Sequence, residues 1–179
     1  MAESASSYLG AWSSFYVITG SSAAALTGLM FVVITITMGE ERLRRSSDGM
    51  AAFSTPIVLH LSVALLVSAV LCAPWHSLVM PGVSIGIAGL YGIVYIVRIV
   101  YRTRRLTSYT PDVEDWAWYS VLPLVAYGAV FGGAIALEVV PAKALFAVAG
   151  GVLLLIFIGI RNAWDIVTFI AIRGPDDLG

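Results

Sequence analysis

The chain has 179 residues, of which 59% are hydrophobic and only 12% are charged, and its formal net charge is −1. A soluble domain carries roughly twice that fraction of charged residues, so lipid is expected to cover much of the surface. The near-neutral charge argues against nucleic acid as a partner. The single cysteine, Cys72, excludes an intrachain disulfide and a CxxC dithiol site.

Apolar runs of about 20 residues, the length that crosses a bilayer as a helix, occur five times. The predicted spans cover about 12–38, 56–73, 81–101, 116–140 and 142–172. We therefore predict an all-α polytopic membrane protein, a bundle of five transmembrane helices that forms one transmembrane domain over 1–179. The first 15 residues contain no basic residue, so we expect a retained first span and not a cleaved signal peptide.

Small residues recur at every fourth position in four of the spans. They are Gly20, Ala24 and Gly28; Gly82 and Gly86; Gly128 and Gly132; and Ala147 and Gly151. This spacing lets helix backbones approach closely, which is a main packing device in lipid. The interpretation we favour is packing within the bundle, and the alternative is a subunit interface of a homo-oligomer.

Prolines mark the predicted helix boundaries. Proline would occupy the first helical position at Thr55-Pro56, Met80-Pro81, Thr110-Pro111 and Val140-Pro141. Pro123 instead lies inside the fourth span. It removes one backbone hydrogen bond there, and this predicts a kink in that helix.

The basic residues predict the orientation in the membrane. Arginines follow the first, third and fifth spans, at Arg42, Arg44, Arg45, Arg102, Arg104, Arg105 and Arg173. The opposite loops carry only Lys143. The positive-inside rule then places the N-terminus outside and the C-terminus inside the cell, in a bacterial inner membrane.

The segment Arg161-Asn162-Ala163-Trp164-Asp165 interrupts the last apolar run with two charges one helical turn apart. Ionisable groups within a membrane usually face a protein interior or a water-filled cavity, and they often mark function. The alternative is a structural ion pair that holds two helices together.

Other polar residues are expected at the same cytoplasmic side. His60 would lie one turn inside the second span, Arg98 one turn inside the third, and Tyr95 one turn deeper. We hypothesise that these three line an inward-open polar cavity with Arg161, Asn162 and Asp165. The competing interpretations are a snorkelling Arg98 and a structural His60.

No catalytic or metal centre is predicted. His60 and His76 are separated by most of a span, so they do not form a bis-histidine haem site. Zinc and di-iron centres need several clustered His, Cys or carboxylate ligands, and no such motif occurs. The G-x-S-x-G form at 82–86 opens a membrane helix and follows no strand, so it lacks the context of a hydrolase elbow.

Permeation of an ion or small solute through the polar cavity is the predicted function. A proton relay through Arg161, Asp165 and His60 is one form of it. The alternatives are an assembly or regulatory membrane subunit without catalytic activity, and a protein that binds an anionic lipid through Arg98, Arg161 and His60. No cofactor is predicted, but a bound lipid is allowed, and the expected partners are membrane lipids and further copies of the chain.

Overall fold

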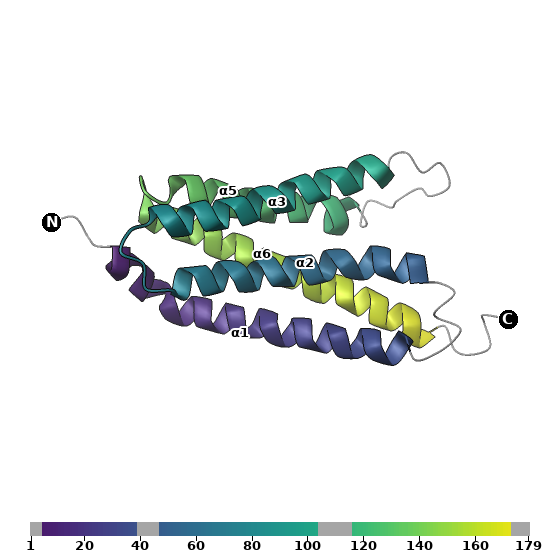
Figure 1. Ribbon diagram of the computed structural model, residues 1–179. Coiled ribbons are helices and arrows are strands. Elements are labelled where there is room, and N and C mark those ends of the chain that lie inside the picture. The colour runs from purple at the N-terminus through teal and green to yellow at the C-terminus, as the bar shows by residue number, and fades with distance from the viewer. Residues whose placement is uncertain (1–4, 39–46, 104–115, 173–179) are drawn as a thin grey trace.

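The computed structural model describes residues 5–38, 47–103 and 116–172, and all of its regular structure there is helical (Figure 1). The elements are α1 (Ala5–Met38), α2 (Ser47–Cys72), α3 (Val79–Thr103), the π-helix η2 (Ala117–Val121), α5 (Leu122–Ala136) and α6 (Pro141–Ile172). The prediction of an all-α fold is thereby confirmed. The predicted topology rests on residues that are not described: Arg42, Arg44, Arg45, Arg104, Arg105, Arg173 and the Thr110-Pro111 boundary lie outside these ranges.

Several predicted boundaries differ from the helices. The largest error concerns α2, which begins at Ser47 and carries Pro56 inside the helix, not at its first position. Proline is tolerated inside membrane helices because neighbouring groups satisfy the freed carbonyl. The helices α1 and α3 also begin earlier than predicted, at Ala5 and Val79. Pro141 is the first residue of α6, as its position predicted.

The fourth predicted span is irregular at both ends. It begins as η2, a π-helical turn that ends two residues before Pro123. A proline clashes with the carbonyl four residues earlier, here that of Tyr119, and the wider π turn relieves this conflict. At the other end α5 stops at Ala136, four residues before the predicted end. The Val140 N–H there donates to the Ala136 carbonyl in a tight turn that leads into Pro141.

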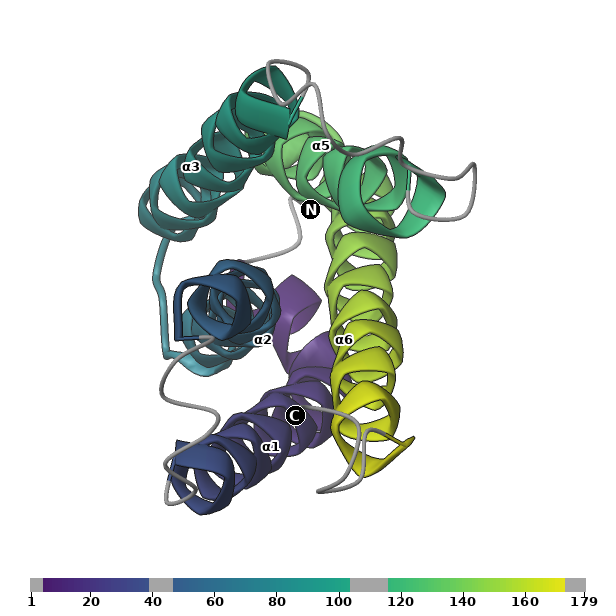
Figure 2. The same cartoon turned by 90° about the vertical axis from the view of Figure 1, so that its right-hand side faces the viewer.

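The helices pack as two pairs joined mainly by the last helix. Contacts join α1 to α2 and α3 to α5, and α6 contacts α5, α2 and, more weakly, α1. A smaller contact joins the pairs directly, between α2 and α3. Figure 2, viewed along the bundle, shows α6 beginning beside α5 and ending beside α1. Because α6 crosses between the pairs, its inner face is where side chains from both halves of the bundle meet.

Glycines set the distance between α3, α5 and α6. A Cβ added at Gly89 would lie 2.9 Å from the backbone nitrogen of Phe131, and one at Gly151 would lie 2.8 Å from the Ala126 carbonyl oxygen. Gly82 and Gly86 also face α5. Gly28, Gly128 and Gly132 have open space beside them, and Ala24 is exposed, so these small residues do not pack against other helices in the described part of the chain.

Four of the helices are long and apolar enough to cross a membrane: Ala5–Val33, Val79–Tyr101, Ala117–Ala136 and Pro141–Asp165. The corresponding apolar part of α2, Pro56–Cys72, is shorter. Large apolar side chains such as Ile18, Ile87, Ile135 and Phe146 are exposed on the outside of the bundle. This pattern indicates a multi-pass membrane protein, because lipid can cover a surface that water would not.

Candidate functional site

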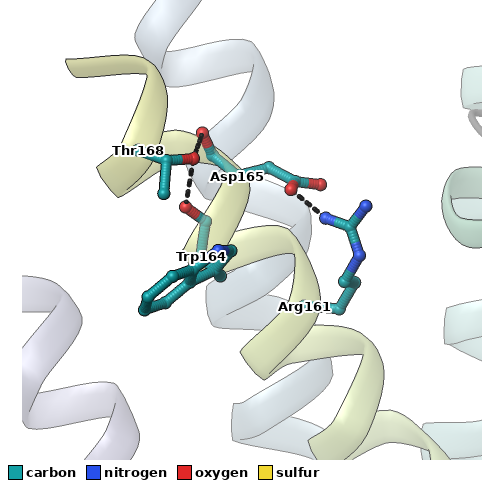
Figure 3. Close-up of polar contacts among 4 residues, drawn as sticks. All are labelled: Arg161, Trp164, Asp165 and Thr168. Carbon is teal, nitrogen blue, oxygen red and sulfur yellow. Dashed lines mark hydrogen bonds and ion pairs between the residues drawn. The ribbon is translucent and has the colours of Figure 1, made fainter. Parts of the chain in front are cut away.

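Arg161 and Asp165 form an ion pair along the outside of one turn of α6 (Figure 3). The side chains of Arg161 and Asp165 are 35% and 38% exposed, respectively. The Thr168 hydroxyl donates to the carbonyl oxygens of Trp164 and Asp165, at 2.9 and 3.1 Å. The pair therefore belongs to a single helix, so the ion pair itself does not join two helices.

Arg161 also contacts the π-helical turn. Its guanidinium carbon lies 5.8 Å from the centroid of the Trp118 ring. A cation at this distance from an aromatic face is attracted by the ring's quadrupole. Because η2 presents Trp118 to α6, the distortion next to Pro123 places an aromatic surface beside the charged pair.

Asn162, between these charges in sequence, is directed into the protein. Its side chain is 1% exposed, and neither its amide oxygen nor its amide nitrogen has a hydrogen-bond partner within the described part of the chain. Gly159, one turn earlier on the inner face of α6, lies against Leu61 of α2. An amide offers two donors and an acceptor, and leaving such groups unsatisfied costs about 1–3 kcal/mol each.

His60 makes a hydrogen bond that the sequence analysis did not anticipate. Its Nδ1 lies 2.8 Å from the Tyr127 hydroxyl, which joins α2 to α5. Both residues are fully buried, with His60 1% exposed. The Tyr127 ring fills the space beside Gly92 of α3, where an added Cβ would lie 2.2 Å from the ring. This one contact therefore brings together three helices.

The position of His60 along its helix differs from the prediction. Since α2 begins at Ser47, His60 lies about 20 Å from that end and about 18 Å from Cys72. His60 is therefore at the middle of the helix α2, although it still lies about one turn inside the apolar part, which begins at Pro56. The sequence analysis missed the first two turns of this helix because they precede Pro56 and are less apolar.

The remaining two predicted residues lie on α3. Tyr95 is half-buried, and its ring stacks on that of Tyr91 with 6.5 Å between centroids. Arg98 is exposed near the end of the helix. The six predicted residues thus lie in three places: on α6, in the buried contact of α2 with α5, and on α3, where Tyr95 packs against the core and Arg98 is exposed.

Sequence reasoning also missed a polar contact between α1 and α2. The hydroxyls of Thr19 and Ser68 are 3.1 Å apart and buried. Gly20 leaves room for Ser68, since a Cβ there would lie 2.9 Å from the Ser68 Cβ. Single serines and threonines are common in apolar helices, so their partners are not evident before the helices are packed.

Among the described residues no group of three or more His, Cys, Asp or Glu side chains is placed to hold a metal ion. In comparisons with protein families, with curated proteins and with solved structures, nothing matches this chain.

Proposed function

We propose that this protein is a five-span membrane protein that lets protons or a small hydrogen-bonding solute permeate through the polar groups inside its bundle. In this proposal the N-terminus lies outside and the C-terminus inside the cell, and several copies assemble. In this proposal the buried Asn162 and the buried His60–Tyr127 pair form the inner part of the path, and the partly exposed Arg161–Asp165 pair, Tyr95 and Arg98 form its mouth nearer the cytoplasm. The path opens on the cytoplasmic side.

The buried amide of Asn162 carries this proposal. A polar side chain with both donor and acceptor unsatisfied is rare in a folded protein, where buried polar groups nearly always have partners. In a membrane helix a hydrophobic residue would be less costly at such a place. A water molecule or a small solute that both donates and accepts hydrogen bonds would satisfy the amide.

The chemistry of the neighbouring groups limits what can pass. The His60 ring and the Tyr127 hydroxyl, 2.8 Å apart, can each exchange a proton with a hydrogen-bonded neighbour. The two charges of Arg161 and Asp165 neutralise each other within one turn. The site therefore suits protons, water or a small uncharged solute better than a bare ion, which would need a stronger compensating charge.

Flux into proteoliposomes tests this function. Proton entry is followed with a pH-sensitive dye trapped inside the vesicles, and urea entry is followed by light scattering after rapid mixing. Wild-type protein should carry at least one of the two above the rate of protein-free vesicles. Asn162→Leu keeps the branched shape and the number of heavy atoms of the side chain and removes the amide, and it should abolish that flux.

Ser84→Ala is the matched control for that variant. The Ser84 hydroxyl donates to the Met80 carbonyl in its own helix, at 2.9 Å, so its loss removes a polar group that already has a partner. Flux should survive this change. Equal flux in Asn162→Leu and wild type would contradict the proposal, as would wild-type vesicles that leak no faster than empty ones. Co-purification of a second protein together with absent flux would favour an assembly subunit.

A further inference from the structure

A groove runs between α3 and α5 at the end of the bundle opposite to the Arg161–Asp165 pair. It is a shallow, open groove of about 340 Å³, and its lining includes Gly82, Gly86, Leu90, Phe131, Ile135 and Glu138. All of these side chains except that of Glu138 are apolar or absent. The volume is at the lower end of the range of about 300–1,000 Å³ that is typical of pockets for one small molecule.

The groove is polar at one end only. Glu138 lies just after α5 ends at Ala136, and Gly82 lies near the start of α3 beside Leu137. From Val79 to Leu90 the apolar lining extends about 16 Å along α3, toward the middle of that span. The Glu138 carboxylate at one end of this apolar groove makes the groove complementary to an amphiphile, which has a polar head and an apolar tail.

The glycines make the groove deep enough for a chain. Gly82 and Gly86 have no side chains between the helices, and a Cβ at Gly86 would only touch the Ala134 Cβ at 3.5 Å. On either side Val83, Ile87 and Ile135 are exposed and form apolar walls. A single flexible hydrocarbon chain can follow such a floor.

The negative charge of Glu138 indicates which kind of molecule binds in the groove. A carboxylate attracts an ammonium head group, and a primary ammonium also donates hydrogen bonds to it. An anionic head group is repelled. A second copy docked through this groove by two-fold symmetry would bring two Glu138 carboxylates together, an arrangement that like charges disfavour.

We propose that this groove holds one acyl chain of an aminophospholipid, with the Glu138 carboxylate binding the primary ammonium of the lipid head group. This site is independent of the permeation path, and it prefers a zwitterionic lipid with an ammonium head group to the anionic lipid that the arginines suggested.

Lipid counting tests the proposal. The full chain is reconstituted in vesicles of equal parts phosphatidylethanolamine and phosphatidylglycerol and extracted in mild detergent. The lipids that stay bound are then counted by native mass spectrometry. The wild-type chain should retain one phosphatidylethanolamine and little phosphatidylglycerol. In Glu138→Gln the preference for phosphatidylethanolamine should fall about tenfold, the effect expected of one lost charge-assisted hydrogen bond.

Two further variants test the groove itself. Gly86→Leu fills the floor and should abolish retention, whereas Gly150→Leu, on a face of α6 with open space beside it, should not. Lys143, near the start of α6, is the other charged residue close to the turn between α5 and α6. Lys143→Gln should leave the preference for phosphatidylethanolamine unchanged. If Gly86→Leu does not fold, the comparison of Glu138→Gln with Lys143→Gln still tests the proposal. Equal retention of both lipids by wild type, or full retention by Gly86→Leu, would overturn the proposal. A dimer that Gly86→Leu disrupts would assign the groove to a second copy.

Discussion

At the scale of single residues, Asn162 stands out in the described structure because its polar side-chain atoms are buried without hydrogen-bond partners. It is buried on the inner face of α6, and its amide has no partner there. Arg161 and Asp165, one residue before it and three after it, satisfy each other and are half exposed. The charged residues attract attention in the sequence, but the unsatisfied group is the neutral amide between them.

Asn162→Leu tests whether the Asn162 amide is hydrogen-bonded to water or solute, or has no hydrogen-bond partner. If water or solute binds the amide, its removal should leave the melting temperature of the purified protein unchanged or lower it. If nothing binds there, the same change should stabilise the protein by about 1–3 kcal/mol, because it removes an unsatisfied buried group. Thermal unfolding in detergent measures the difference, and clear stabilisation would contradict a hydrated interior.

The His60–Tyr127 hydrogen bond should be measurable as a coupling energy. Tyr127→Phe removes the hydroxyl, His60→Leu removes the ring nitrogens, and the double variant removes both sides of the contact. Polar contacts between membrane helices contribute about 0.5–1.7 kcal/mol in such double-mutant cycles. We expect a value in that range from equilibrium unfolding. Purely additive effects of the two changes would show that the bond does not stabilise the fold.

At the scale of helices, the bundle depends on close approach at particular glycines. The backbone of Phe131 lies against Gly89, and the Ala126 carbonyl lies against Gly151. Backbone atoms cannot rotate away as a side chain can, so these contacts fix the separation of α3 from α5 and of α5 from α6.

Gly89→Ala should therefore destabilise the protein by about 1–3 kcal/mol, since the new methyl group would lie 2.9 Å from the Phe131 nitrogen. Gly10→Ala is the matched control, because its added Cβ would meet no described atom within 4 Å apart from its chain neighbours and the backbone of its own helix. There alanine should be neutral or stabilise α1 by up to about 1 kcal/mol. Equal effects at the two positions would mean that α3 and α5 are less tightly packed than described.

The sequence predicts where the helices lie far better than it predicts which face of each helix is buried. Long apolar runs and the arrangement of prolines indicate the number of helices, and Pro141 marks the start of α6 correctly. The inner faces are not evident because lipid is as apolar as the core, so no polar stripe separates inside from outside. For this reason Gly132 and Gly133, adjacent in sequence, face open space and α6 respectively, and only the packed structure distinguishes them.

Part of the candidate site can be predicted from the sequence, because most of each helix is apolar. Charges stand out in an apolar helix, so Arg161 and Asp165 were evident from composition. Tyr127 was not, because tyrosine is common in membrane helices and its partner is 67 residues away in sequence. The start of α2 is predicted too late because a proline at 56 resembles a helix start, whereas α2 continues through it.

At the scale of the whole molecule, the four long apolar helices indicate a multi-pass membrane protein, and the orientation can be tested with the natural cysteine. Cys72 is exposed and ends α2. With the N-terminus outside, a membrane-impermeant maleimide should label Cys72 from outside intact cells. A Cys72→Ser chain carrying Ser46→Cys should be labelled only after the membrane is opened. The reverse pattern would invert the topology.

Access of water to the polar groups from the cytoplasm is the central claim, and cysteine accessibility tests it most directly. In a Cys72→Ser background, cysteines replace Tyr95, Arg98 and Asp165 one at a time, with Ile87→Cys on the lipid-facing surface of α3 as the control. Inside-out vesicles are treated with a charged thiol reagent. We predict reaction at positions 95, 98 and 165 and none at 87. Complete protection at all three would contradict an inward-open polar cavity.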